Sequence, residues 1–260
     1  MEVKTILLIA VILILLIVVL RYAWSGPTQI TSLTSASTVQ NIPSSQLSAS
    51  TVGPVNYSYS IWFYVNDWNV NFGAEKVLFE RLSSNYGGVN NTFPCPKVTL
   101  GASQNNLEIS IGCTNGDYSG SPTAGTPTLC SDDSTKDCSR SQYIVHKCSV
   151  WNVPIQRWVH LIVSCYGRTV DVYIDGKLTR TCVLPGQALV DANAGAMITP
   201  DGGFSGYTSN FMYWSTPCDP QTAWNLYRQG YNGSMLGSFT QYGLRLSLLK
   251  GSQEAGSVTI

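Results

Sequence analysis

Carboxylate side chains are the first residues to weigh for chemistry, because two of them facing each other can hydrolyse a glycosidic bond. Glycosidases hold such carboxyl groups about 5–5.5 Å or ~6.5–9.5 Å apart across that bond. Glu75 and Glu80 are five positions apart, which puts them on opposite faces of a strand that holds both, and Glu108 stands alone in its strand. Asp171 and Asp175 share a face, but Asp175 precedes a glycine in a dipeptide typical of turns. The acids predict no catalytic pair, and we expect the chain not to be an enzyme.

The two histidines, His146 and His160, indicate packing rather than catalysis or metal binding. His160 lies near Trp158 in an alternating segment, so we expect a packed, hydrogen-bonded side chain and not the base of a Ser/His/Asp triad. No C-x2-C pair occurs, and neither histidine is spaced with cysteines as zinc-finger ligands are. Zinc binding is therefore disfavoured.

The cysteines all follow the first apolar segment of the chain, which is typical of disulfides formed on an oxidising side of a membrane. Cys130 and Cys138 could close a small loop. Cys165 and Cys182 fall on predicted strands that a third strand separates, so we do not expect them to bridge directly. The disulfide candidates are Cys95, Cys113, Cys130, Cys138, Cys148, Cys165, Cys182 and Cys218.

The chain opens with an apolar run, residues 6–20, that contains no polar side chain. Extended to residue 24, it forms a helix of about 19 residues, near 28 Å at ~1.5 Å per residue, enough for a bilayer core of ~30 Å. A cleaved signal peptide is the alternative, but an uninterrupted run of this length is at the upper limit for one. We therefore expect residues 1–24 to be an uncleaved, single-pass anchor, with an orientation that the flanking charges leave open. The apolar run of this anchor begins at Ile6 and ends at Leu20, and we expect Arg21 to snorkel and Trp24 to lie at the interface.

Composition divides the rest of the chain. Residues 25–53 are rich in Ser, Thr, Ala, Gln and Pro and carry no charge, so they either span a gap as a flexible stalk or lie extended along another surface. We expect a linker. Residues 54–233 hold the folded domain, and residues 234–260 form a C-terminal extension.

The formal net charge is zero and only 12% of residues are charged, which disfavours a nucleic-acid partner. Glycosylation sequons occur at Asn56, Asn90 and Asn232.

Alternating apolar and polar residues predict β-strands throughout the central domain. Residues 158–184 form three short antiparallel strands, the last two joined by Asp175-Gly176, a dipeptide that suits a type I′ turn. Residues 57–66 carry bulky side chains on both faces, which indicates a central strand. Residues 113–142 lack periodicity and predict one long loop stapled by disulfides. Further strands are expected over residues 76–82, 97–103, 106–112, 142–150 and 204–214.

A single short helix is predicted near the end of the domain. Asp219 is a good N-cap, Pro220 suits the first helical position, and Gly230 suits the C-terminal end. Beyond it, the apolar residues 244–249 could add a strand or dock elsewhere, and residues 252–260 are expected to be loose.

Three segments resemble the concanavalin A-like superfamily of lectins, glucanases, pentraxins and laminin G domains. Trp158-Val159-His160-Leu161 followed by Val172 to Leu178 is similar to its "W-x-H, then V-Y-x-D-G-K" signature. Residues 58–68 resemble its early strand, and residues 202–230 resemble its closing strand and short helix. The resemblance spans roughly residues 55–232 and implies an all-β, two-sheet antiparallel jelly roll. It says little about function, because one sandwich hosts many activities.

The resemblance leaves several functions open. The short N-terminal tail, anchor, Ser/Thr-rich segment and jelly roll resemble the layout of virion membrane and minor capsid proteins of large icosahedral DNA viruses. We therefore expect a non-enzymatic, membrane-anchored structural or interaction protein, with neighbouring capsid proteins as partners, in a virion or otherwise at a cell surface. The second hypothesis is a lectin that binds glycans with calcium, as relatives do through oxygens in edge loops, and a glycosidase is third. We expect no cofactor other than calcium, whose candidate ligands are Asp191, Asn193 and Asp201, with Asp219 nearby.

Overall fold

The computed structural model of the chain describes residues 29–47, 55–83, 92–116, 130–131, 142–232, 245–250 and 253–259. One sheet, here sheet A, contains β1 (Thr34–Ser35), β3 (Asn56–Asp67), β9 (Trp158–Tyr166), β10 (Thr169–Ile174), β11 (Lys177–Val183) and β13 (Ser205–Trp214). The other, sheet B, contains β2 (Gln40–Ile42), β4 (Lys76–Ser83), β5 (Phe93–Leu100), β6 (Asn106–Thr114), β7 (Cys130–Ser131), β8 (Tyr143–Trp151) and β12 (Ala196–Ile198). The remaining elements are η1 (Ser44–Gln46), α2 (Pro220–Gln229), β14 (Arg245–Lys250) and β15 (Gln253–Thr259).

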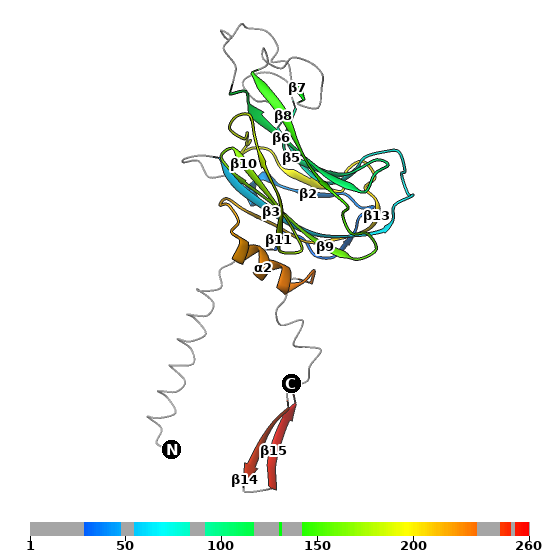
Figure 1. Cartoon of the computed structure of the whole chain (residues 1–260). Helices are drawn as coiled ribbons and strands as arrows, with labels where there is room; N and C mark the ends of the chain where they lie inside the picture. Colours follow the sequence, from blue (N-terminus) through cyan, green and yellow to red (C-terminus); the bar gives the residue numbers. More distant parts are fainter. Residues whose placement is uncertain are drawn as a thin grey trace.

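The two sheets stack around a shared apolar core (Figure 1). Sheet A has the strand order β1-β13-β3-β9-β10-β11, and sheet B has the order β2-β12-β4-β5-β6-β8-β7. The described pairings within these sheets are antiparallel apart from the parallel pair β7–β8. The all-β sandwich of two antiparallel sheets is therefore confirmed. The strands predicted from alternation are all present, with ends that differ by a few residues.

Both faces of strand β3 are buried. Its alternate residues Tyr57, Tyr59, Ile61, Phe63 and Val65 are buried in the core between the sheets. Its other face is buried as well, because α2 packs over the outer side of sheet A (Figure 1). The prediction that residues 57–66 form a central strand is confirmed, since β3 lies between β13 and β9.

The N-terminal Ser/Thr-rich segment is part of the sandwich where the structure describes it. Strand β1 pairs with β13 of sheet A, and β2 pairs with β12 of sheet B. The sparse apolar residues Ala36, Ile42 and Leu47 are buried in the core. The expected linker is therefore wrong for residues 29–47, which take the other alternative and lie extended along both sheets. The physical reason is that backbone pairing needs no apolar run, and three buried side chains suffice to fix the segment.

Arg81 fastens this segment from inside the sandwich. The guanidinium is fully buried, and its Nη2 donates to the carbonyl oxygens of Leu47 at 3.2 Å and Asp191 at 2.7 Å. Its Nε donates to the Ala194 carbonyl at 3.0 Å, and Nη1 donates to the Tyr59 hydroxyl at 3.1 Å. One side chain thus ties together sheet B, the end of η1 and the connection before β12.

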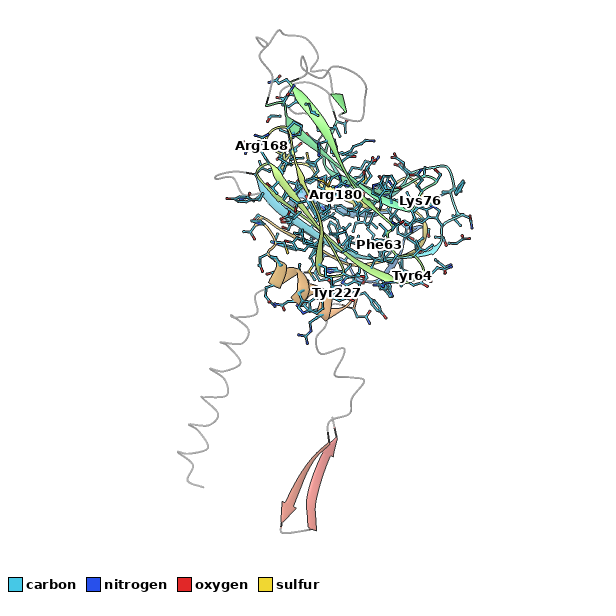
Figure 2. All side chains as sticks on the ribbon, in the orientation of Figure 1. Phe63, Tyr64, Lys76, Arg168, Arg180 and Tyr227 are labelled. Atoms are coloured by element: carbon cyan, nitrogen blue, oxygen red, sulfur yellow. A yellow bond between two sulfur atoms is a disulfide. The ribbon has the colours of Figure 1, made fainter. Side chains whose placement is uncertain are left out.

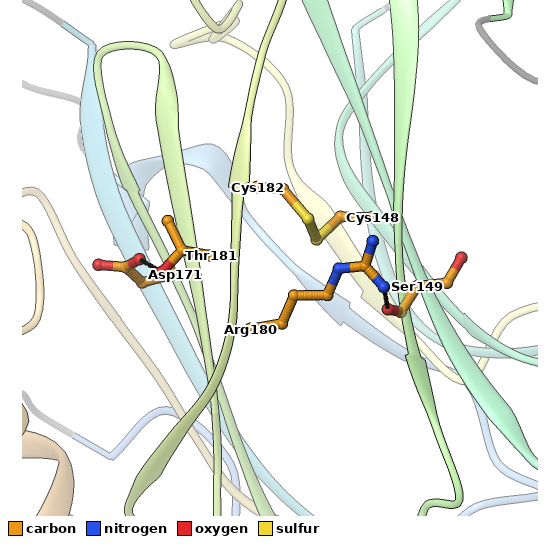
Figure 3. The surroundings of a disulfide bond; sticks show 6 residues. All are labelled: Cys148, Ser149, Asp171, Arg180, Thr181 and Cys182. Atoms are coloured by element: carbon orange, nitrogen blue, oxygen red, sulfur yellow. Dashed lines mark hydrogen bonds between the residues drawn. A yellow bond between two sulfur atoms is a disulfide. The ribbon is translucent and has the colours of Figure 1, made fainter.

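A disulfide joins the edges of the two sheets. Cys148 of β8 bonds to Cys182 of β11, and beside it Arg180 donates to the Ser149 carbonyl at 2.6 Å (Figure 3). Cys165 and Cys182 both lie opposite Val170 in the register, so a strand separates them as expected.

The remaining cysteines differ in their surroundings. Within the described residues, Cys95, Cys165 and Cys218 are buried thiols outside any disulfide. Cys113 is buried in the core with its Sγ 3.5 Å from the Ile144 carbonyl oxygen. The Cys130 and Cys138 side chains lie outside the described part, so the small loop between them stays a prediction.

Removing the inter-sheet disulfide should destabilise the fold. The bridge closes a loop with a sequence separation of 34, so the double substitution Cys148→Ser/Cys182→Ser should lower the free energy of unfolding by about 3 kcal/mol. Urea unfolding followed by circular dichroism measures it. Either single substitution should lose nearly as much, and a loss below about 1 kcal/mol would contradict a stabilising role.

The end of the chain matches the prediction in part. Asp219 caps α2 by accepting from the Gln221 and Thr222 amides, and Pro220 and Gly230 hold their expected positions. For residues 244–249 the sequence left open an added strand or docking elsewhere; residues 245–250 form strand β14, in a two-stranded sheet separate from sheets A and B. The expectation that residues 252–260 are loose is wrong, because β15 pairs antiparallel with β14. Short alternating segments of small residues give little sequence signal, and the pairing supplies their structure.

Within the described residues, no helix has both the length and the apolarity needed to cross a bilayer. The anchor predicted over residues 1–24, with Ile6, Leu20, Arg21 and Trp24, lies outside the described part of the chain.

Candidate functional site

A groove of about 460 Å³ lies at the β11 edge of the sandwich. Three elements form it: the loop after β8, the β10–β11 turn and α2. Two indoles on its lining are solvent-exposed, Trp151 at 57% and Trp224 at 40%. We call it the edge groove, and its principal residues are Trp151, Asn152, Arg157, Asp175, Lys177 and Trp224.

The loop after β8 is held in place at both ends. The amide of Asn152 donates to the Asn105 carbonyl at 2.9 Å, and the amide of Gln156 donates to the Val65 carbonyl at 2.9 Å. Both Asn152 and Gln156 have positive φ, 58° and 55°, a region that non-glycine residues adopt only where their surroundings impose it. The wall that carries Trp151 is therefore pre-formed.

The β10–β11 turn forms the second part of the groove. Asp175 and Gly176 have φ of 50° and 73°, so both central residues are left-handed, as the predicted type I′ turn requires. Gly176 also packs against α2, since a Cβ there would lie 2.9 Å from the Tyr227 Cβ and 3.1 Å from the Trp224 Cε3. Only glycine allows the helix to approach the turn this closely.

Polar residues on the outer face of sheet A fix the start of α2. The Ser58 hydroxyl donates to the Thr216 carbonyl at 2.8 Å, and the Cys218 amide donates to the Ser164 hydroxyl at 2.8 Å. The Tyr173 hydroxyl donates to the Cys218 carbonyl at 3.2 Å. Together with the Asp219 cap, these bonds set the position from which α2 presents Trp224 and Tyr227; Figure 2 labels Tyr227 on the helix.

His160 lies buried beneath α2. Its ring stacks on Trp62 with centroids 4.8 Å apart, and Tyr227 stacks on the same indole at 5.7 Å. His160 Nε2 and the Ser60 hydroxyl are 2.8 Å apart, whereas Nδ1 has no hydrogen-bond partner among the described residues. Asp175 accepts from the backbone amide of His160, not from its ring. The histidine is packed and hydrogen-bonded, as predicted, and it forms no triad.

Protonation of His160 should destabilise the fold in acid. Burial lowers its pKa from 6.5 to about 3. Between pH ~6.5 and ~3, His160 is therefore protonated in the unfolded chain but neutral in the folded chain. The free energy of unfolding should therefore fall by up to about 1.4 kcal/mol per pH unit from this group between pH ~6.5 and ~3. Denaturant titrations from pH 7 to pH 4 should show a smaller loss for His160→Gln than for the unsubstituted chain. An equal loss of unfolding free energy in the two proteins would contradict the attribution of this acid destabilisation to His160.

The edge groove carries more positive than negative charge. Asp175 accepts from Arg157 Nη2 and, through its other oxygen, from the His160 amide at 3.0 Å. Both of its oxygens therefore already have donors. Arg157 is more than half exposed, and the exposed Lys177 lines the same groove. The groove presents spare donors and a net positive charge.

The structure does not bring the predicted calcium ligands to this groove. Asp191 Oδ1 accepts from the Asn193 amide at 2.9 Å and Oδ2 accepts from the Ser83 hydroxyl at 3.0 Å, so the carboxylate stabilises its own turn. Asp201 occupies a left-handed turn position with φ of 57°, and Asp219 caps α2. In the described part of the chain, no three His, Cys, Asp or Glu side chains gather as metal ligands would. These residues act as turn formers and caps.

The remaining candidates from the sequence are two glutamates of sheet B and the asparagines of the glycosylation sequons. Glu80 pairs with Lys97 at 3.6 Å and Glu108 pairs with Lys147 at 3.0 Å, each across neighbouring strands of sheet B. Asn56, the first residue of β3, has its Oδ1 buried. Asn232 is exposed after α2, and Asn90 lies outside the described residues.

The aromatic residues of the groove were not predicted as a site. Of the two exposed tryptophans, Trp224 is the one that helical periodicity could have indicated. Ala223 and Leu226 form the buried face of α2, and Trp224 lies outside that face. Trp151 ends a strand and carries no such signal. Their approach depends on pairing between distant segments.

No known protein family matches the sequence, and no curated protein matches it. Solved structures with a similar fold include the binding domain of botulinum neurotoxin DC in complex with SialylT, at 11% identity and a TM-score of 0.45, covering 79% of this chain and 48% of that one. The receptor binding domain of botulinum neurotoxin D has 12% identity and a TM-score of 0.45, with 76% and 47% covered. The serotype G binding domain has 13% identity and a TM-score of 0.40, with 79% and 47% covered. The chain thus spans less than half of each, and similarity this distant carries no information about ligands.

Proposed function

We propose that the chain is a non-enzymatic, membrane-anchored interaction protein whose sandwich binds carbohydrate in the edge groove. The supporting observation is the pair of exposed indoles, Trp151 and Trp224, on a groove that also offers polar groups. A pyranose ring has a face of C–H groups that stacks on an indole, and its hydroxyls need hydrogen-bond partners at the rim. Asn152, Arg157 and Lys177 supply those partners. Exposed aromatic side chains beside a few fixed polar groups are typical of recognition sites.

The charges of the groove favour a sugar that carries a carboxylate. Arg157 and Lys177 outnumber Asp175, whose two oxygens already accept hydrogen bonds. An incoming ligand therefore meets donors more readily than acceptors. Charge-assisted hydrogen bonds to a carboxylate are the stronger kind.

The placement of the acids supports binding without hydrolysis. Among the described residues that line the groove, Asp175 is the only carboxylate, and glycoside hydrolysis needs two. Glu80 and Glu108 face lysines instead of each other's carboxyl groups. A glycosidase would need a second acid in the groove.

The apolar residues 6–20 provide the membrane anchor in this proposal. A place in a virion membrane or minor capsid layer, expected from the layout of the chain, stays a prediction that detection of the chain in purified particles would test. The other location is a cell surface.

A glycan array probed with the full chain in detergent tests the function. Neutral, carboxylated and sulfated sugars are compared with and without calcium, and carboxylated sugars should bind most strongly in both conditions. Binding that needs calcium would direct attention to Asp191, Asn193 and Asp201 instead. A blank array from folded, disulfide-bonded protein would leave the sandwich as a scaffold and refute carbohydrate binding.

A further inference from the structure

The register of the first described residues gives the direction in which the chain leaves the sandwich. Thr34 lies opposite Thr208 on β13, and Gln29 forms an antiparallel bridge to Met212. Going back along the chain toward residue 1, the segment therefore runs toward Trp214, the C-terminal end of β13. At Gln29 the described chain is therefore directed toward that end of sheet A.

The same end of sheet A is formed by the β9–β10 turn. Trp214 lies opposite Ser58 in the register, and two residues further on Asn56 lies opposite Tyr166. Tyr166 in turn pairs with Thr169, and Thr169 pairs with Val183 of β11. We call this the turn end of sheet A, and it consists of Tyr166, Gly167, Arg168 and Val183.

The distance from this end to the predicted anchor is short. Only residues 25–28 separate Trp24, the expected interfacial residue, from Gln29. Fully extended, this connection spans at most about 18 Å at ~3.6 Å per residue. The pairing of residues 29–47 with both sheets leaves no stalk that could lift the sandwich further from the bilayer.

The exposed side chains at the turn end suit a lipid headgroup region. Tyr166 is 58% exposed and Val183 is 65% exposed, while Arg168 is exposed and held in place by donating to the Leu184 and Pro185 carbonyls. Tyrosine and arginine are the residues that proteins place at this depth, with an amphipathic ring or a charged head at the interface.

We infer that the turn end of sheet A faces the lipid headgroups, and that the edge groove faces away from the bilayer. The groove lies at the other end of the same strands, because the β10–β11 turn with Asp175 and Lys177 is opposite the start of β9. Strand β9 runs from Trp158 to Tyr166, which separates the two ends by roughly 26 Å at ~3.3 Å per residue. The inference rests on the anchor of the proposed function and holds whatever ligand occupies the groove.

Energy transfer from single sites to a membrane-bound acceptor tests this orientation. The full chain is reconstituted in phosphatidylcholine vesicles containing a lipid with a rhodamine headgroup, and a genetically encoded fluorescent amino acid replaces Tyr166, Val183 or Lys177. Val183 and Lys177 are a matched pair, because both are exposed and lie at opposite ends of β11. Transfer should be at least about twofold more efficient from positions 166 and 183 than from position 177, given the roughly 20 Å along β11 and roughly 26 Å along β9 that separate the two ends at ~3.3 Å per residue.

Equal transfer from the three positions, or more efficient transfer from position 177, would overturn the orientation. Flotation of the vesicles on a sucrose gradient separates this failure from failure of the anchor. A chain that floats with equal transfer overturns the orientation alone, whereas a chain that stays at the bottom overturns both. Carbohydrate binding on the array is independent of either outcome.

Discussion

Replacing Arg81 with leucine is expected to lower the free energy of unfolding by about 4–5 kcal/mol. The substitution leaves the carbonyl oxygens of Leu47, Asp191 and Ala194 without their donor inside the sandwich. Each buried acceptor that loses its partner costs about 1–3 kcal/mol. Urea unfolding followed by tryptophan fluorescence measures the loss. Because Leu47 ends the N-terminal segment, limited proteolysis should also cut residues 29–47 faster in this variant.

The matched control is Arg168→Leu. Arg168 also donates to backbone carbonyls, those of Leu184 and Pro185, but its own side chain is exposed (Figure 2 labels it) and its bond to Pro185 lies at the surface, where water can replace it. Its loss should cost less than about 1 kcal/mol. Similar losses for the two arginine variants would mean that burial of Arg81 does not matter, and the account of how the N-terminal segment is fastened would fail.

Replacing Trp151 with alanine is expected to weaken binding of the best sugar on the array by about 100-fold, or ~2.7 kcal/mol, with little change in stability. Trp151 is largely exposed, so its removal leaves the core intact but takes away the flat apolar surface on which a sugar ring would stack. Trp224→Ala should weaken binding by about 10-fold or more by the same reasoning. Titration calorimetry on the full chain in detergent measures the dissociation constants.

Tyr207→Ala is the control for these two substitutions. Tyr207 is 49% exposed and lines another groove, at the β1 edge of sheet A, the edge opposite β11. Its removal should leave sugar binding unchanged within about twofold. If Tyr207→Ala abolished binding while Trp151→Ala did not, the site would belong to the β1 edge.

Much of the sandwich is encoded locally and could be predicted. Strands β9, β10 and β11 show alternation that periodicity reads directly, and Asp175-Gly176 fixes their hairpin. The cap residues of α2, Asp219 and Gly230, are likewise local signals. In each case the chemistry that specifies the element lies within the element itself.

The wrong predictions have a different physical origin. Residues 29–47 look like a linker because their pairing with β13 and β12 joins segments more than 150 positions apart, a relation that composition cannot express. Long-range backbone pairing leaves little trace in the sequence of the paired segment. Strand β15 was missed for a different reason: its partner β14 is its neighbour in the chain, but residues 253–259 contain few apolar side chains, so the sequence gives no strand signal there.

The edge groove was not predicted from the sequence. The candidate ligands were instead the acidic and amide residues Asp191, Asn193 and Asp201. In the structure Asp191 accepts a hydrogen bond within its own turn and Asp201 occupies a left-handed turn position, and calcium binding by these residues stays a prediction. The edge groove depends on Gly176 letting α2 approach the β10–β11 turn, a contact visible only in three dimensions.

Photo-cross-linking can show where on the sandwich the sugar binds. The strongest sugar from the array is prepared with a diazirine group, irradiated with the full chain, and the labelled peptides are identified by mass spectrometry. We expect label on the peptides that contain Trp151 or Trp224, reduced by an excess of the unmodified sugar. Competable label confined to residues 202–207, near the β1 edge of sheet A, would contradict binding in the edge groove.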